Sequence, residues 1–158
     1  MTENELDRYM RLYYRSVYNT ALCCCKNPCD ADDVAQDVFL ALYLRGDIFE
    51  SEKQLRSWLL RCAYNKSIDI IRSHWHKFSV PLENGYSDLS CDDKYASELL
   101  ETVMSLGKKY RAVLYLYYYE EYSVGEIADI LRISEAAVRT RMQRGRGRLK
   151  KILENERN

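Results

Sequence analysis

The sequence contains few residues that interrupt helices and no segment that could cross a membrane. Its 158 residues include two prolines and six glycines, too few for the many turns of a β-rich fold. No apolar run approaches the ~20 residues of a membrane helix. The acidic, polar start at residues 1–5 is unlike a secretory signal. We therefore expect an all-α protein that is cytoplasmic and does not insert into membranes.

The sequence also lacks the residue patterns of common enzymes. It has no glycine-rich phosphate-binding loop and no H-E-x-x-H motif. Cys23–Cys25 are consecutive and point about 100° apart on a helix, and with Cys29 they form no C-x-x-C pair. We expect no enzyme activity, no cofactor, no metal and no small-molecule substrate. A thiol or metal sensor built on Cys23–Cys29 stays an alternative.

The net charge is zero, but the charges are unevenly distributed. Of the 24 basic side chains, eight lie in the segment 132–151, which holds a single acid, Glu135. The segment 78–94 instead holds four acids and one base, with Pro81 and Gly85 and no sustained apolar stripe. We expect 78–94 to be a flexible acidic linker between two small helical domains, residues 1–77 and 95–158. The basic segment indicates a polyanionic partner.

Apolar residues recur at helical spacing through the first domain. Residues 6–22 predict one long helix that stops near Asn27-Pro28. Asp30 is expected to cap a second helix, which Gly46 would end. The segment 51–54, Ser-Glu-Lys-Gln, predicts a capping box that opens a third helix with a basic outer face.

The second domain contains a predicted helix-turn-helix. Ser123–Glu126 is a capping box that opens a short apolar helix, Arg132-Ile133 would form the turn, and Ser134 would cap a basic second helix. Thr and Gln can hydrogen-bond base edges, and Arg can bind guanine or phosphate. Such side chains on this helix are Arg139, Thr140, Gln143, Arg144 and Arg146. The alternative is an ordinary helical hairpin with an exposed basic helix.

Four stretches of the chain carry a resemblance to a known family. Asp30–Phe39 (DADDVAQDVF) is similar to a polymerase-binding motif, Trp58–Arg72 to a minus-ten helix, and Tyr110–Leu114 with Ser123–Arg146 to a minus-thirty-five-binding domain. They occur in the order typical of bacterial RNA polymerase sigma factors of the extracytoplasmic-function class, which the chain resembles over nearly its whole length. The resemblance implies a protein that binds the polymerase core and directs it to a subset of promoters.

The resemblance also implies roles for individual residues. Implied polymerase contacts are Asp33, Gln36, Asp37 and Phe39. Implied minus-ten contacts are Phe49, Asn65, Lys66, Asp69 and Arg72, with the loop 48–54 holding an extruded non-template base. Implied minus-thirty-five contacts are Ser134, Arg139, Thr140, Gln143, Arg144 and Arg146. Helices around 99–119 would contact the polymerase flap, and an anti-sigma factor is a further implied partner.

Some positions depart from the family's pattern. Arg132 stands where glycine is usual in the turn, and in a left-handed conformation it would cost ~1 kcal/mol. Gly107 stands where proline is common. Gly145 and Gly147 lie inside the basic helix at a cost of roughly 0.5–1 kcal/mol each, so we expect its C-terminal half to fray or to become ordered on DNA. A stand-alone helix-turn-helix regulator of transcription that binds DNA without polymerase stays the alternative.

Overall fold

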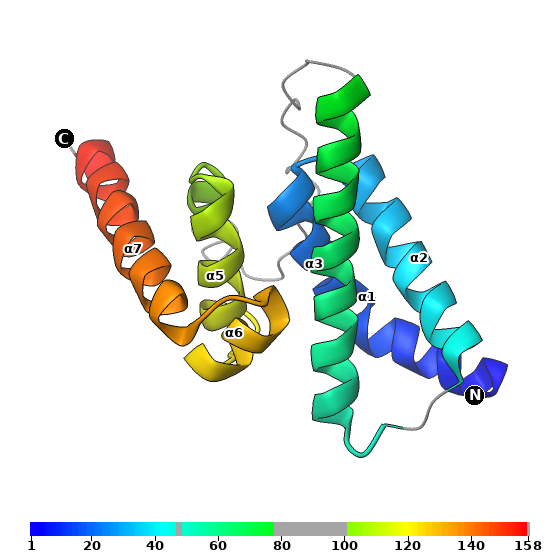
Figure 1. Ribbon diagram of the computed structural model, residues 1–158. Helices are drawn as coiled ribbons and strands as arrows, with labels where there is room; N and C mark the ends of the chain where they lie inside the picture. The colour runs from blue at the N-terminus through cyan, green and yellow to red at the C-terminus, as the bar shows by residue number, and fades with distance from the viewer. Residues whose placement is uncertain (47–48, 78–100, 158) are drawn as a thin grey trace. The chain divides into compact units, whose positions relative to one another are not determined.

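The chain is helical and divides into two compact units. The computed structural model describes residues 1–46, 49–77 and 101–157, and these contain helices and no strands (Figure 1). The units are Met1–Asn84 and Gly85–Asn158. The all-α prediction is therefore confirmed, whereas the predicted linker 78–94 lies outside the described residues. Among the helices in these three ranges, none is long and apolar enough to span a membrane.

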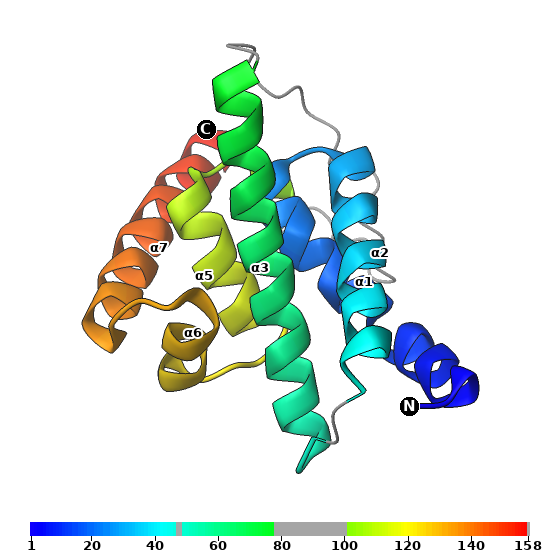
Figure 2. The same cartoon turned by 45° about the vertical axis from the view of Figure 1, so that its right-hand side comes forward.

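The first unit consists of three helices that pack on one another. They are α1 (Glu3–Cys25), α2 (Pro28–Arg45) and α3 (Glu52–Lys77), and each contacts the other two (Figures 1 and 2). Their apolar stripes meet in a common core. Fully buried members are Val17, Leu22, Val34, Val38, Phe39, Leu59 and Leu60. This burial leaves the outer faces of the helices free for other roles.

Local signals set the ends of these helices, with one correction. Asn27, not Asp30, caps α2: its side chain accepts a hydrogen bond from the Asp30 N–H (3.1 Å), and Pro28 occupies the first helical position. Gly46 ends α2 in the left-handed conformation (φ 66°), as predicted. At α3, the Gln54 N–H donates to the Ser51 hydroxyl (3.1 Å). The Gln54 side chain in turn accepts a hydrogen bond from the Glu50 N–H (2.7 Å), whereas a complete capping box would have it accept from the Ser51 N–H.

The second unit contains α5 (Lys108–Tyr118), α6 (Val124–Leu131) and α7 (Glu135–Arg157), preceded by helical residues 101–104. Both α5 and α6 pack against α7. Val103, Leu106 and Leu114 form a buried cluster, which Leu149 and Ile152 of α7 cover. The cluster holds α7 along one side and leaves its other side exposed.

Helix α7, the basic helix of the predicted helix-turn-helix, does not fray at its glycines. Helix α7 continues through Gly145 and Gly147 to Arg157, so the expectation of a frayed C-terminal half is wrong. A Cβ atom on Gly145 would lie 2.9 Å from Leu114 Cδ1 and 3.2 Å from Tyr110 Cβ, whereas one on Gly147 would meet nothing within 4 Å. Gly145 is therefore a point at which α7 approaches α5 closely, and a side chain there would require Leu114 or Tyr110 to shift.

Candidate functional site

One exposed face of α2 combines acidic and apolar side chains. Asp33, Gln36 and Asp37 are exposed, and the amide of Gln36 donates to Asp32 (2.7 Å). One and two helical turns further, Leu40 and Leu44 are 55% and 74% exposed. Residues three and four apart share a helix face, so these side chains form one continuous strip. We call Asp33, Gln36, Asp37, Leu40 and Leu44 the α2 strip.

Phe39 does not belong to this strip. Its side chain is 1% exposed, and its ring lies 6.1 Å from that of Tyr14 on α1. Tyr14 also donates a hydrogen bond to Asp32. The expected direct contact of Phe39 with a partner is therefore not available in this conformation, and Phe39 instead holds α2 against α1.

Helix α3 presents a second set of predicted site residues. Asp69 and Arg72 are exposed, and Asn65 is half-buried. Their spacing of four and three residues places all three on one side of the helix. Lys66, half-buried, lies on the neighbouring row. The structure thus brings four of the five predicted minus-ten residues to adjoining rows of one helix.

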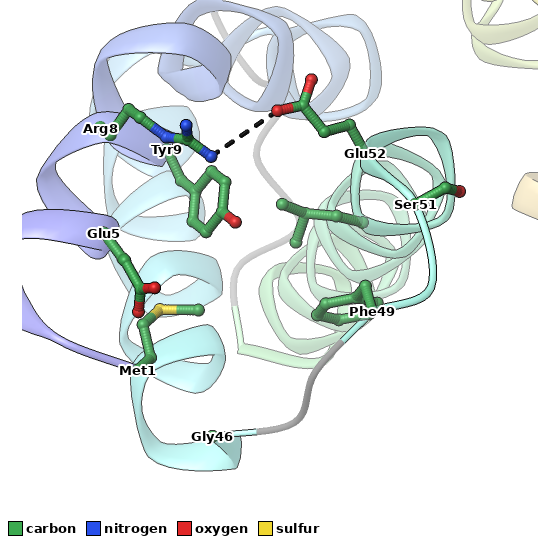
Figure 3. A pocket seen from close by; sticks show the side chains of 9 residues that line it. Met1, Glu5, Arg8, Tyr9, Gly46, Phe49, Ser51 and Glu52 are labelled. Atoms are coloured by element: carbon green, nitrogen blue, oxygen red, sulfur yellow. Dashed lines mark ion pairs between the residues drawn. The ribbon is translucent and has the colours of Figure 1, made fainter.

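The fifth, Phe49, lies in the connection between α2 and α3, at the edge of a pocket of about 500 Å³ (Figure 3). This volume is within the range of small-ligand sites. Lining residues are Met1, Glu5, Arg8, Tyr9, Gly46, Phe49, Ser51, Glu52 and Leu55. The rings of Tyr9 and Phe49 come from different segments and lie on different sides of the pocket (Figure 3). It can accommodate a flat ring with polar groups at its rim.

Polar contacts join α1 to the start of α3 beside this pocket. Arg8 forms an ion pair with Glu52 (3.6 Å), and the Tyr13 hydroxyl donates to the same carboxylate (3.5 Å). Burial, and then the charge of Glu52, raise the pKa of Tyr13, so its hydroxyl keeps the proton that it donates. The contribution of α1 to the pocket could not be predicted from the sequence, because no local signal pairs residues 5–13 with residues 49–55.

The helix-turn-helix of the second unit has the predicted caps. Ser123 and Glu126 form a complete capping box on α6, and Ser134 accepts a hydrogen bond from the Ala137 N–H (3.0 Å) at the start of α7. Arg132 takes the left-handed conformation (φ 57°), and the Ile133 N–H donates to the Ala128 carbonyl (3.1 Å). The turn therefore keeps its geometry without glycine, at a cost of ~1 kcal/mol.

The basic face of α7 is open to solvent. All six predicted residues are exposed: Ser134, Arg139, Thr140, Gln143, Arg144 and Arg146. Arg139 pairs with Glu135 (3.5 Å). Arg146 differs from the others because its Nε donates to the Tyr118 hydroxyl (2.7 Å) and its guanidinium carbon lies 5.5 Å from the Tyr117 ring centroid. Arg146 therefore braces α7 against α5.

Four cysteines lie where α1 ends and α2 begins. Cys23, Cys24 and Cys25 are buried, and Cys29 is exposed. Within the part of the chain that the structure describes, no group of three or more His, Cys, Asp or Glu side chains is placed to hold an ion.

Two models of known protein families match the chain, one over the helices α1–α3 and one over the helices α5–α7. The family model "Sigma-70 region 2" matches residues 9–77, and "Sigma-70, region 4" matches residues 96–149. The chain is 30% identical to the ECF RNA polymerase sigma factor SigW of Bacillus subtilis, over 93% of this chain and 83% of SigW. It is 28% identical to SigM of Mycobacterium tuberculosis, over 93% of this chain and 76% of SigM.

Solved structures show the same fold. The sigma factor RpoE, in its complex with the anti-sigma factor NepR from Bartonella quintana, matches 95% of this chain and 97% of its own, with a TM-score of 0.74 and 20% identity. CnrH, in complex with the cytosolic domain of CnrY, matches 98% of this chain and 90% of its own, with a TM-score of 0.69 and 25% identity.

Proposed function

Because the chain belongs to the extracytoplasmic-function family of RNA polymerase sigma factors, which direct the polymerase to promoters, we propose that its two units recognise the two promoter elements separately. Residues 1–77 would serve the polymerase and the minus-ten element, residues 95–158 the minus-thirty-five element, and 78–94 would connect them. The matches at residues 9–77 and 96–149 support these bounds. The protein would act in the cytoplasm, with no catalytic activity of its own.

The α2 strip is the proposed polymerase contact. Acidic side chains repel DNA phosphates, so a face that carries Asp33 and Asp37 suits a protein partner. Exposed Leu40 and Leu44 add apolar area of the kind that association buries. This single observation carries the proposal, because the strip offers acidic and apolar contacts that suit a protein partner and none of the basic contacts that DNA requires. The stand-alone regulator is accordingly not favoured.

The minus-ten element would lie along α3, with one base in the pocket. Asn65, Asp69 and Arg72 offer donors and acceptors along one side of the helix. An extruded base would enter between Tyr9 and Phe49, where aromatic faces can stack on it. Extrusion costs a few kcal/mol of stacking, which contacts in the pocket must offset.

The minus-thirty-five element would lie against α7. Arg139, Thr140, Gln143 and Arg144 are the proposed base readers, because they lie in the N-terminal half of a helix that follows a helix-turn-helix turn. Ser134 is placed to contact a phosphate. Arg146 is assigned a smaller share of DNA binding than the other arginines of this set, since Tyr118 already accepts a hydrogen bond from its Nε.

An anti-sigma factor is the proposed regulatory partner. RpoE and CnrH, the similar proteins of known structure, are described in complexes with NepR and with CnrY. The α2 strip is a surface on which such a partner could exclude polymerase, since it exposes apolar side chains in the isolated chain. A partner of this kind should compete with core polymerase for the chain in a pull-down assay. Simultaneous binding of both would contradict a shared surface.

Run-off transcription tests the proposal as a whole. Pooled genomic fragments are transcribed by bacterial core polymerase with and without the protein, and discrete start sites that require the protein are expected. Asp33→Ala with Gln36→Ala should abolish these starts and binding to core. Asp7→Ala, which removes an exposed carboxylate from α1, is the matched control and should leave both unchanged. Equal activity of the double variant and the control would exclude the α2 strip.

A further inference from the structure

Arg45, the last residue of α2, lies against two aromatic rings from other segments of the first unit. Its guanidinium carbon is 5.5 Å from the ring centroid of Phe49 and 5.1 Å from that of Trp58. The two rings are 5.7 Å apart and inclined at 53°. A guanidinium within about 6 Å of a ring is attracted to the face of that ring. The three side chains therefore form one cluster, which we call the Arg45 cluster.

The Arg45 cluster shares one ring, that of Phe49, with the lining of the pocket. Phe49 belongs both to the cluster and to the pocket lining, and Figure 3 shows its side chain among those that line the pocket. Phe49 itself lies outside any helix, so no helical hydrogen bond fixes its main chain. Its ring is half-buried. The position of this wall thus depends on the contacts that the ring makes with Arg45 and Trp58.

The opposite wall has a similar construction. On α1, the guanidinium carbon of Arg8 lies 5.0 Å from the ring centroid of Tyr9, and Arg8 is itself held by Glu52 (3.6 Å). Both rings that face the pocket are therefore supported by an arginine before any ligand enters. A site whose walls are already ordered does not lose side-chain freedom on binding.

We propose that Arg45 and Trp58 are positioning residues that hold Phe49 ready to stack on the extruded non-template base. Neither residue is expected to touch the base. The inference rests on the proposed function, since it requires that a base enters the pocket. Base–aromatic stacking tolerates any base, so the cluster contributes to binding of an extruded base and not to the choice of sequence.

A double-mutant cycle between Arg45 and the base tests this inference. Promoter fragments from the run-off experiment carry an abasic residue at one non-template minus-ten position at a time, and binding of the holoenzyme is measured. The wild-type chain is expected to lose about 10-fold at one position. Arg45→Ala should weaken binding to the intact fragment about 3- to 5-fold and leave binding to that abasic fragment unchanged. Arg45→Lys, which keeps a cation at the rings, should restore part of the loss.

Two control variants separate this role from a general structural one. Arg11→Ala removes a guanidinium from the surface of the same unit, where Arg11 pairs with Asp7 (3.0 Å), and should bind both fragments as the wild type does. Arg45→Met keeps the length of the side chain without its charge and should resemble Arg45→Ala. Thermal unfolding of every variant shows whether the first unit remains folded.

The possible results are distinct. If the wild type is sensitive to one abasic position and Arg45→Ala and Arg45→Met lose affinity equally for intact and abasic DNA, Arg45 acts on the backbone or on the fold, and the inference is overturned. If the wild type loses nothing at any abasic position, the proposed base pocket fails and the inference fails with it. A loss confined to the intact base supports both.

Discussion

Helices α2 and α7 each turn one side to solvent but carry opposite chemistry. Helix α2 holds four acids and one base, with leucines exposed beyond them, whereas α7 holds eight bases and three acids. In each unit one side of the helix is fixed in a core and the other faces solvent. The comparison teaches that packing supplies the exposed face and that its charge would select the class of partner, which we propose is a protein for α2 and nucleic acid for α7.

The two helices are also held in place differently. Helix α2 is anchored by large side chains, above all Phe39, which is 1% exposed. Helix α7 approaches α5 at Gly145, where there is no side chain. Removing side-chain atoms at Phe39 should therefore destabilise the first unit, and adding side-chain atoms at Gly145 should destabilise the second.

The largest expected effect is that of Phe39→Ala. The substitution leaves a cavity between α1 and α2, and we expect it to lower the free energy of unfolding by about 3–5 kcal/mol. Asp33→Ala, six residues earlier on the α2 strip, should leave stability within about 0.5 kcal/mol of wild type. Urea denaturation measures both. If Phe39→Ala unfolded like wild type yet lost polymerase binding, Phe39 would be a surface contact after all.

The next effect concerns the two glycines of α7. We expect Gly145→Val to lower the free energy of unfolding by about 1–3 kcal/mol, because its side chain would overlap Leu114 and Tyr110. Gly147→Ala, in open space, should raise it by roughly 0.5–1 kcal/mol by restricting the unfolded chain. Thermal unfolding of the full chain would show shifts of opposite sign. Shifts of the same sign would mean that α7 does not pack on α5 in this way.

A third pair of variants compares two arginines of α7. Arg144→Ala should weaken promoter binding by about 1–3 kcal/mol and relax preference at one base pair, if Arg144 reads a base. Arg146→Ala removes the Tyr118 hydrogen bond and should weaken binding of all sequences alike by about 1 kcal/mol. Competition among promoters with single base-pair changes gives both profiles. If Arg146→Ala instead changed the preference at one base pair, Arg146 would be a base-reading residue.

The smallest expected effect is a pH dependence at the start of α1. The hydrogen bond from the Thr2 N–H (2.9 Å) holds the pKa of Glu5 below its usual value. Since the pKa is lower in the folded state, the stabilisation is present above the unfolded pKa and is lost as the pH falls through the folded pKa. Acid unfolding followed by circular dichroism should be slightly less steep for Glu5→Gln. If the acid unfolding curves of Glu5→Gln and wild type were identical, the hydrogen bond between Thr2 and Glu5 would not persist in solution.

Much of the fold could be predicted from the sequence because its signals are local. Apolar periodicity placed the helices, and the capping box at Ser123 and the glycine at Gly46 marked two of their ends. The cap at Asn27 was also detectable, because Pro28 is typical of the first helical position. The burial of Phe39 follows from the same stripe as Val34 and Val38, and the motif resemblance obscured it.

The remaining features depend on contacts between distant residues. Nothing near Tyr9 or Arg8 indicates that α1 forms one wall of the pocket. The aromatic partners of Arg146 lie 28 and 29 residues before it, so its contact with α5 could not be predicted from its neighbours in the sequence. Gly145 also depends on a distant contact. It lies close to Leu114, whereas helix propensity alone predicted that α7 would fray at its glycines.

The close contact at Gly145 bears on the engineering of promoter preference. Positions 139, 140, 143 and 144 are exposed and lie off the α5 contact, so a library that randomises them samples DNA recognition without selecting for folding. Met142 is 4% exposed and Gly145 is buried, so the same library must leave both unchanged. Along α7, positions that can be varied therefore alternate with positions that must be kept. Variants of this one fold could in this way be selected to recognise different promoters.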